Sequence, residues 1–216
     1  KIAIAVGVII AVFLVIKGIS LFRSAGGFHK NSAENIAATD LCAQALALET
    51  AEPLKAKEIY KKVLADFSDF DKIEDVQKKL EALNTKIVLS NIETPSTVIH
   101  VVEKGDSLAK IAKKYKTTVA LIKKSNHLKS DVIRLGQRIR IWKGVFSVFV
   151  DKSQNILILK SDDAIIKVYP VSTGANNSTP VGTFTIAVKQ INPVWFKGGQ
   201  VIPPESPENV LGTRWM

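Results

Sequence analysis

The sequence has few of the residues that build covalent frameworks and metal centres. Among its 216 residues are one cysteine, Cys42, and three histidines, His29, His100 and His127. One cysteine excludes a disulfide within the chain and any zinc site with four cysteine ligands. The three histidines are far apart in sequence, which argues against a histidine-rich metal site. We therefore expect neither a metal ion nor a cofactor.

An initiator methionine is also missing, because the sequence begins at Lys1 and its one methionine is Met216. We therefore expect a processed chain or a slice of a longer one. The length allows one large domain or two small ones.

Acidic residues are scarce in one part of the chain, although the whole chain has 20 of them against 30 lysines and arginines. Residues 98–142 carry eleven basic and three acidic residues, a net charge of +8, whereas residues 31–97 carry a net charge of −4. Residues 1–30 have four basic residues and no acidic one, and residues 143–216 have a net charge of +2. This division indicates four segments with different roles, and an anionic partner for the third.

The first segment is almost free of polar residues. Ile2 to Ile16 is an unbroken apolar run, and its continuation to Phe22 adds only Lys17 and Ser20 as polar residues. A helix of about 21 residues, with a rise of ~1.5 Å per residue, is as long as the hydrocarbon core of a bilayer is thick. We predict a transmembrane anchor over residues 1–23, with a cleaved signal peptide as the alternative.

Residues 31–92 have the periodicity of helices. An alanine- and leucine-rich stretch runs to about Leu48, and Pro53 suits the first turn of a second helix. A third helix follows, with apolar residues at three-and-four spacing, which predicts packing against another helix. These residues are Ile73, Val76, Leu80, Leu83 and Ile87.

This small all-α segment is interpreted as a spacer. Its second and third helices are weakly similar to one tetratricopeptide-type hairpin, through Ala56 and Tyr60, but a plain bundle or stalk is the favoured interpretation. Cys42 lies on an alanine and leucine face, so we expect a small buried hydrophobic residue and not a nucleophile. Residues 93–97 have the composition of a linker.

Residues 98–142 combine two short strands with two short helices. Ile99 to Val102 is a predicted strand, Gly105 permits a sharp turn, and Asp106 or Ser107 is placed to cap a helix. Thr118 is placed to cap the second helix. Arg138 to Ile141 is a predicted closing strand, in which Ile139 and Ile141 alternate inward. The predicted order is therefore βααβ.

This block resembles the LysM family. The matching residues in chain order are Gly105-Asp106-Ser107-Leu108, Ile111-Ala112, Leu121, Asn126, Leu128 and Gly136-Gln137. The resemblance implies binding of glycans that contain N-acetylglucosamine, above all peptidoglycan, in a groove between the first strand–helix loop and the second helix–strand loop. Carried over to this chain, it implies glycan contacts from Gly105, Asp106, Ser107, Leu108, Asn126, Leu128, Asp131 and Ile133.

The lysines of this block raise the question of nucleic acid. They lie on the expected solvent faces of two helices, where charge is the default, and no aromatic platform accompanies them. We therefore expect no nucleic-acid partner. Attraction to the carboxylates and phosphates of wall polymers accounts better for the charge. The lysines concerned are Lys110, Lys113, Lys114, Lys116, Lys123 and Lys124.

Residues 145–216 have an all-β pattern. Apolar residues on both faces of Ile156 to Leu159 predict that this strand is central. The β-rich runs are separated by Asp, Ser, Asn and Gly turns and cover Phe146–Asp151, Ile156–Lys160, Ala164–Val171 and Gly182–Val188.

Three motifs of this segment resemble the L,D-transpeptidase catalytic domain. They are Tyr169-Pro-Val-Ser-Thr-Gly174, Ser178-Thr179-Pro180-Val-Gly182-Thr-Phe184 and Asn209-Val-Leu211-Gly212-Thr-Arg214-Trp215-Met216. The resemblance implies a nucleophilic cysteine in a Ser-His-Gly-Cys-x-Arg stretch, and no such stretch occurs in the sequence. We therefore expect residues 145–216 to be the N-terminal part of the domain, assign no catalytic residue, and expect the 216-residue chain to be inactive.

The expected protein is multidomain: a transmembrane helix (1–23), a helical spacer (31–92), a LysM domain (98–142) and a partial all-β catalytic domain (145–216). The resemblance implies peptidoglycan remodelling by thiol acyl transfer from tetrapeptide stems to the amine of a neighbouring stem. The expected location is the bacterial inner membrane, with the bulk of the protein facing the periplasm or wall. The alternative is a non-catalytic, membrane-anchored peptidoglycan-binding protein.

Overall fold

The structure is a computed structural model that describes residues 32–216. The chain forms two compact units, the first ending at Ser172 and the second covering Thr173–Met216. The transmembrane helix expected over residues 1–23 lies outside the described residues. Within residues 32–216, every helix is too short or too polar to cross a membrane.

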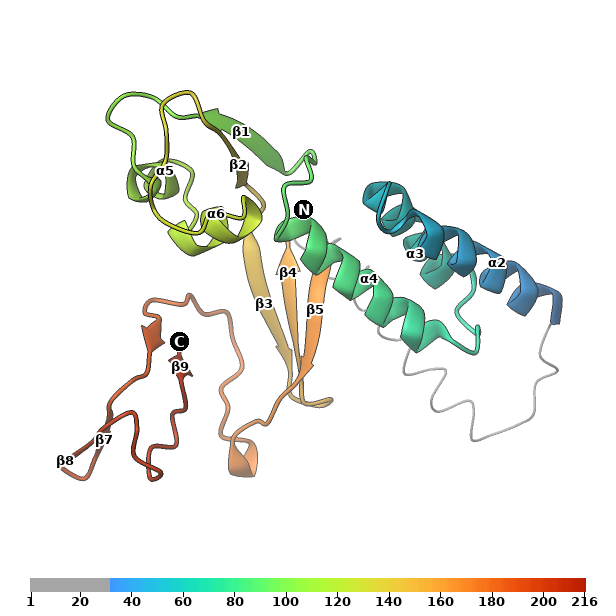
Figure 1. Cartoon of the computed structure of the whole chain (residues 1–216). Helices are drawn as coiled ribbons and strands as arrows, with labels where there is room; N and C mark the ends of the chain where they lie inside the picture. The colour runs from blue at the N-terminus through green and yellow to red at the C-terminus, as the bar shows by residue number, and fades with distance from the viewer. Residues whose placement is uncertain (1–31) are drawn as a thin grey trace. The chain divides into compact units, whose positions relative to one another are not determined.

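Three helices begin the described part of the first unit: α2 (Ser32–Leu48), α3 (Pro53–Asp66) and α4 (Ile73–Val88). Helix α3 packs between α2 and α4 (Figure 1). Pro53 begins α3 as predicted, and Ala56 and Tyr60 are fully buried. In α4 the predicted stripe is buried at Val76, Leu80, Leu83 and Ile87. The resemblance to a tetratricopeptide hairpin stays a prediction.

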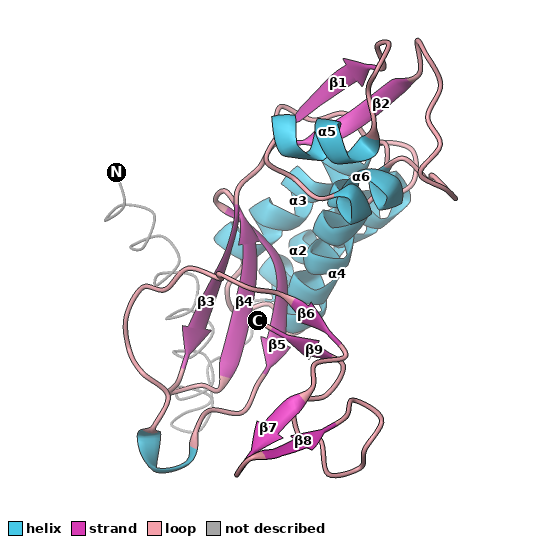
Figure 2. Cartoon of the chain, turned by 90° about the vertical axis from the view of Figure 1, so that its left-hand side faces the viewer, coloured by secondary structure: helices cyan, strands magenta, loops and turns pink. Residues whose placement is uncertain are grey.

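The predicted βααβ order follows. It comprises β1 (Thr97–Val101), α5 (Leu108–Lys114), α6 (Val119–Ser125) and β2 (Arg138–Trp142). The two strands form an antiparallel ribbon, and both helices pack on one side of it (Figure 2). Apolar side chains from both helices, β2 and the first loop form a core of their own: Val102, Leu108, Ile111, Ala112, Ile122, Ile139 and Ile141.

A three-stranded antiparallel sheet completes the first unit. Strand β4 (Ile156–Ser161) is central, as predicted, between β3 (Phe146–Asp151) and β5 (Ala164–Pro170). Because β5 is an edge strand, its outer backbone groups need partners from elsewhere. Helix α4 lies along this edge (Figure 1) and supplies them.

Three side chains of α4 make the contacts to β5. Asn84 donates from Nδ2 to the carbonyl of Ile165 over 2.8 Å, and Thr85 donates from Oγ1 to the carbonyl of Ile166 over 3.3 Å. The backbone N–H of Val168 donates to a carboxylate oxygen of Glu81 over 3.2 Å. Helix α4, expected to belong to a spacer, therefore packs against the sheet and covers its β5 edge.

The second unit consists of short elements. A 3-10 turn, η1 (Ala175–Asn177), precedes two small ribbons, β6 (Gln190–Ile191) with β9 (Arg214–Trp215) and β7 (Trp195–Lys197) with β8 (Gln200–Ile202). The strand predicted over Gly182–Val188 is wrong, because the described backbone is irregular there. Alternation of apolar and polar residues favours a strand, but a strand forms only where a second strand pairs with it.

Candidate functional site

Two loops leave the same end of the β1–β2 ribbon. One covers residues 102–107, between β1 and α5, and the other covers residues 126–137, between α6 and β2. The N–H of Val102 donates to the carbonyl of Gln137 over 2.9 Å, and the N–H of Gly136 donates to the carbonyl of Val102 over 2.9 Å. These bonds hold the bases of the two loops side by side.

The first loop is closed by hydrogen bonds at both ends. Gly105 has φ of +89°, a left-handed conformation that glycine adopts without a steric penalty. The N–H of Asp106 donates to the Glu103 carbonyl over 3.1 Å, and the N–H of Glu103 donates to Asp106 Oδ2 over 2.9 Å. Ser107 accepts from the N–H of Lys110 over 3.3 Å and is thereby the N-cap of α5. The loop is consequently a compact turn joined to a helix start.

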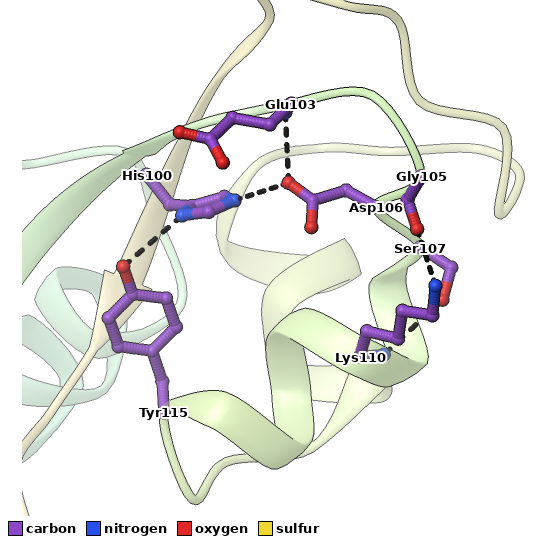
Figure 3. Close-up of polar contacts among 7 residues, drawn as sticks. All are labelled: His100, Glu103, Gly105, Asp106, Ser107, Lys110 and Tyr115. Atoms are coloured by element: carbon purple, nitrogen blue, oxygen red, sulfur yellow. Dashed lines mark hydrogen bonds and ion pairs between the residues drawn. The ribbon is translucent and has the colours of Figure 1, made fainter.

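Beneath this loop lies a nearly buried imidazole (Figure 3). His100 Nε2 lies 2.9 Å from Asp106 Oδ2, and its Nδ1 lies 3.2 Å from the hydroxyl of Tyr115. The hydrogen bond from the Glu103 backbone, followed by the one from His100, lowers the pKa of the Asp106 carboxyl. A carboxylate only accepts hydrogen bonds, so we assign the proton between the two residues to Nε2.

The second loop begins at Asn126, the C-cap of α6. Asn126 Nδ2 donates to the carbonyls of Ile122 and Arg140, each over 2.8 Å, and its Oδ1 accepts from the N–H of Arg140 over 2.8 Å. One side chain therefore joins the end of α6 to β2 and fixes where the loop starts.

The second loop also borders an open hollow of about 490 Å³. Two of its lining residues, Val132 and Leu135, are large apolar side chains that are 77% and 76% exposed. Arg134, Gly136 and Gln137 complete the lining. Apolar surface beside polar groups suits a ligand that carries both, such as an acetamido group.

Comparison with known sequences identifies two adjacent segments of the described region. Residues 100–142 match the family model described as the LysM domain, and residues 146–215 match that of the L,D-transpeptidase catalytic domain. The first segment is a LysM domain, and the second belongs to the L,D-transpeptidase catalytic domain family. The similarity expected from the sequence motifs is thereby confirmed for both.

One similar protein is the probable peptidoglycan endopeptidase LytE of Bacillus subtilis strain 168. It is 50% identical over 40 residues, which are 18% of this chain. The match spans only 12% of the length of LytE. None of the solved structures matches the chain.

Four of the eight predicted glycan contacts of the LysM domain are placed by packing or by an ion pair. Leu108 is 2% exposed in the domain core, and Leu128 and Ile133 are partly buried against the same core. Asp131 is exposed and pairs with Lys123 Nζ at 2.5 Å. The other four, Gly105, Asp106, Ser107 and Asn126, form the turns and caps described above. The structure brings seven of them to two loops with a common base and places Leu108 in the first turn of α5, directly after the first loop. Their contact with a glycan stays a prediction.

The hollow beyond Ile133 and the buried His100 were not indicated by any sequence motif. The loop has more large apolar residues than its contact with the core uses, and the surplus pair, Val132 and Leu135, could have marked the hollow. The pairing of His100 with Asp106 could have been suspected from their separation of six residues, which is a strand end followed by a tight turn.

In the L,D-transpeptidase segment, Thr179 has a structural place. Its Oγ1 accepts from the N–H of Gly174 over 2.7 Å, so it joins two of the sequence motifs that identify the family. A Cβ at Gly174 would lie 2.2 Å from the hydroxyl oxygen of Ser178, which would have to rotate away to make room for it. This agrees with a role for Thr179 in shaping a turn.

The described residues offer no centre for metal or thiol chemistry. Residues 32–216 contain no group of three or more His, Cys, Asp or Glu side chains that could hold a metal ion. Cys42 is half-buried in α2, and its burial raises the pKa of the thiol. A reactive thiolate needs the opposite shift, so Cys42 is unsuited to be the nucleophile.

Proposed function

We propose that this protein is a peptidoglycan-remodelling L,D-transpeptidase that its LysM domain holds on the wall polymer. The observation that carries the proposal is the direct junction of the two family segments, since β2 ends at Trp142 and β3 begins at Phe146. Trp142 also donates from Nε1 to Ser161 Oγ of β4 over 2.9 Å. A polymer-binding domain joined so closely to a catalytic segment raises the local concentration of substrate.

The proposed reaction is thiol acyl transfer. A thiolate attacks the amide carbon between the third residue of a tetrapeptide stem and its terminal D-alanine, and D-alanine leaves with a proton as the thioester forms. The amine of a neighbouring stem then attacks the thioester, which forms the new amide, and the thiol regains a proton. Cys42 lacks the environment for this chemistry, so we assign no catalytic residue among the 216.

We also propose that the protein is attached to the bacterial inner membrane through residues 1–23. The apolar run from Ile2 to Ile16 supports this attachment. The proposed substrate is the wall polymer itself, which supports a location of the remaining residues on the wall side of the membrane.

Binding of the chain to purified peptidoglycan sacculi tests the proposal. We expect co-sedimentation that is reversed by a soluble pentamer of N-acetylglucosamine. Because the LysM block has a net charge of +8, salt is expected to weaken binding without abolishing it. Failure to sediment would contradict the proposal. Binding that salt removes completely and the pentamer leaves unchanged would indicate charge attraction alone.

A further inference from the structure

We propose that His100 is a positioning residue for the first glycan-binding loop of the LysM domain. It holds the carboxylate of Asp106, and through it the turn over residues 103–107, without itself touching the glycan. This inference rests on the proposed glycan binding and adds to it a residue outside the two loops.

The location of His100 excludes direct contact with a polymer. Its side chain is only 6% exposed, and in the β1–β2 ribbon it lies opposite Ile139 of the domain core. Both ring nitrogens are occupied, one by Asp106 and the other by Tyr115 (Figure 3). Any effect of His100 on a bound glycan therefore passes through these partners.

The bond to Asp106 is the side-chain tie between the turn and β1. The other bonds of the turn are local: Glu103 with Asp106, and Lys110 Nζ with the Gly105 carbonyl over 2.6 Å. Asp106 Oδ2 accepts from both the Glu103 N–H and His100. One oxygen thus links the closure of the turn to a fixed ring beneath it.

The charges around His100 and Asp106 favour a stable hydrogen bond between them. Asp106 is kept ionised by the hydrogen bonds that lower its pKa, and a hydrogen bond to a charged group is stronger than one between neutral groups. Lys110 and Lys114 of α5 add positive charge near the turn, and Lys114 also favours the ionised form of Asp106. Tyr115, which packs edge-on against the imidazole at 5.6 Å between ring centres, fixes its orientation.

A fixed turn matters because Gly105 permits many alternative backbone conformations. If the turn were loose in the free protein, glycan binding would have to order it, and that lost entropy would weaken affinity. We expect release of Asp106 from His100 to weaken glycan binding about tenfold.

Two substitutions at one position separate positioning from simple packing. In His100→Gln the side-chain amide nitrogen lies about where Nε2 was, so a donor to Asp106 remains. In His100→Asn the amide reaches only the Nδ1 position, so Asp106 loses its donor. Both remove the ring and are expected to lower the melting temperature, with a larger decrease for Asn because it also loses the hydrogen bond to Asp106. Isothermal calorimetry with a pentamer of N-acetylglucosamine should show near wild-type affinity for Gln and about tenfold weaker binding for Asn.

Tyr115→Phe is the matched control, because it removes the partner of Nδ1 and leaves the bond to Asp106. It should lower stability without changing glycan affinity. Equal affinity of the Gln and Asn variants would overturn the positioning role, as would a loss of affinity in Tyr115→Phe equal to that of Asn.

Amide hydrogen exchange at Glu103 supplies a readout that does not depend on binding, since this N–H donates to Asp106. We expect faster exchange in His100→Asn than in His100→Gln. Equal exchange in the two variants would overturn the inference even if both bind. If the wild-type protein does not bind the pentamer in calorimetry, the proposed function is overturned instead, whatever the exchange rates show.

Discussion

The carboxylate of Asp106 is held in its ionised form by the folded protein. Hydrogen bonds from Glu103 and His100 lower its pKa below that of an unfolded chain. Its contribution to stability is therefore complete above the unfolded pKa, about 4, and is lost as the pH falls through the lower folded value.

This linkage predicts a pH-dependent difference between the wild type and Asp106→Asn. We expect the difference in unfolding free energy, measured with urea, to be larger at about pH 6 than at about pH 3. Ser107→Ala is the control, because loss of the α5 cap should cost about 1 kcal/mol at both pH values. A constant difference for Asp106→Asn would show that its carboxylate adds no pH-dependent stability.

Asn126 satisfies three backbone groups with one side chain, at the carbonyls of Ile122 and Arg140 and the N–H of Arg140. Asn126→Ala leaves these groups without that partner, so we expect a loss of about 2–3 kcal/mol in urea unfolding. Asn91→Ala, at an exposed position, should change stability by less than about 0.5 kcal/mol. An equal effect of the two substitutions would show that the hydrogen bonds of Asn126 to Ile122 and Arg140 do not stabilise the domain.

At the scale of elements, the end of α4 is held by an arginine of another element. Arg140 of β2 is 2% exposed and donates to the carbonyls of Ile87, Val88 and Ile92 over 3.0, 3.1 and 2.6 Å. Carbonyls at a helix C-terminus carry partial negative charge, so a guanidinium is well suited to them. Its planar group also lies over the ring of Trp142.

Arg140→Met is therefore expected to lower the unfolding free energy by about 3 kcal/mol, because it removes three hydrogen bonds to carbonyls, two of them fully buried. Arg140→Lys should restore only part of this loss, since a compact ammonium cannot span all three carbonyls. The control is Arg138→Met on the exposed part of the same strand, with an expected change below about 0.5 kcal/mol. If Arg140→Lys has the same unfolding free energy as the wild type in urea, the role given to the planar guanidinium is contradicted.

Arg140 also illustrates what the sequence could and could not predict. Local rules correctly predicted the cap Thr118 and the inward alternation of Ile139 and Ile141, and they narrowed the cap of α5 to Asp106 or Ser107, of which the structure shows Ser107. Each of these features depends on neighbours within a few residues. The same alternation puts Arg140 on the outer face, where a charged residue is expected to meet water. It is buried instead, because α4 covers that face, and no local pattern reports such a contact.

The strand wrongly predicted over Gly182–Val188 has the same origin, since strand pairing is decided by distant partners. The site residues divide in the same way. The turn and cap residues Gly105, Ser107 and Asn126 could be found from motifs, whereas the contact of Tyr115 with His100 depends on how β1 and α5 pack.

At the scale of the whole molecule, one helix of the first unit, α4, contacts both the LysM domain and the three-stranded sheet. Helix α4 meets the LysM domain through Arg140 and covers the edge of β5 through Asn84, Thr85 and Glu81. Trp142 belongs to the apolar core that α4 shares with Ile166 of the sheet. Elements joined by shared buried contacts are expected to unfold together.

We predict a single cooperative transition for this unit. In a Trp195→Phe/Trp215→Phe background, Trp142 is the remaining tryptophan, and its fluorescence reports the junction of LysM domain and sheet. Its urea midpoint should coincide with that of far-ultraviolet circular dichroism, which follows the helices. Separate midpoints would mean that the helices and the junction unfold independently.

The contacts of α4 with both the LysM domain and the sheet limit how this LysM domain could be exchanged for another one. The LysM domain has a core of its own, which by itself would suit the domain to transfer into another chain. Here a LysM domain moved to another chain would take Arg140 away from the α4 carbonyls that it binds. The edge of β5 would then be covered by a helix whose C-terminal carbonyls have lost the guanidinium. A successful transfer, by evolution or by design, would have to move α4 together with the LysM domain or replace Arg140 by an apolar residue.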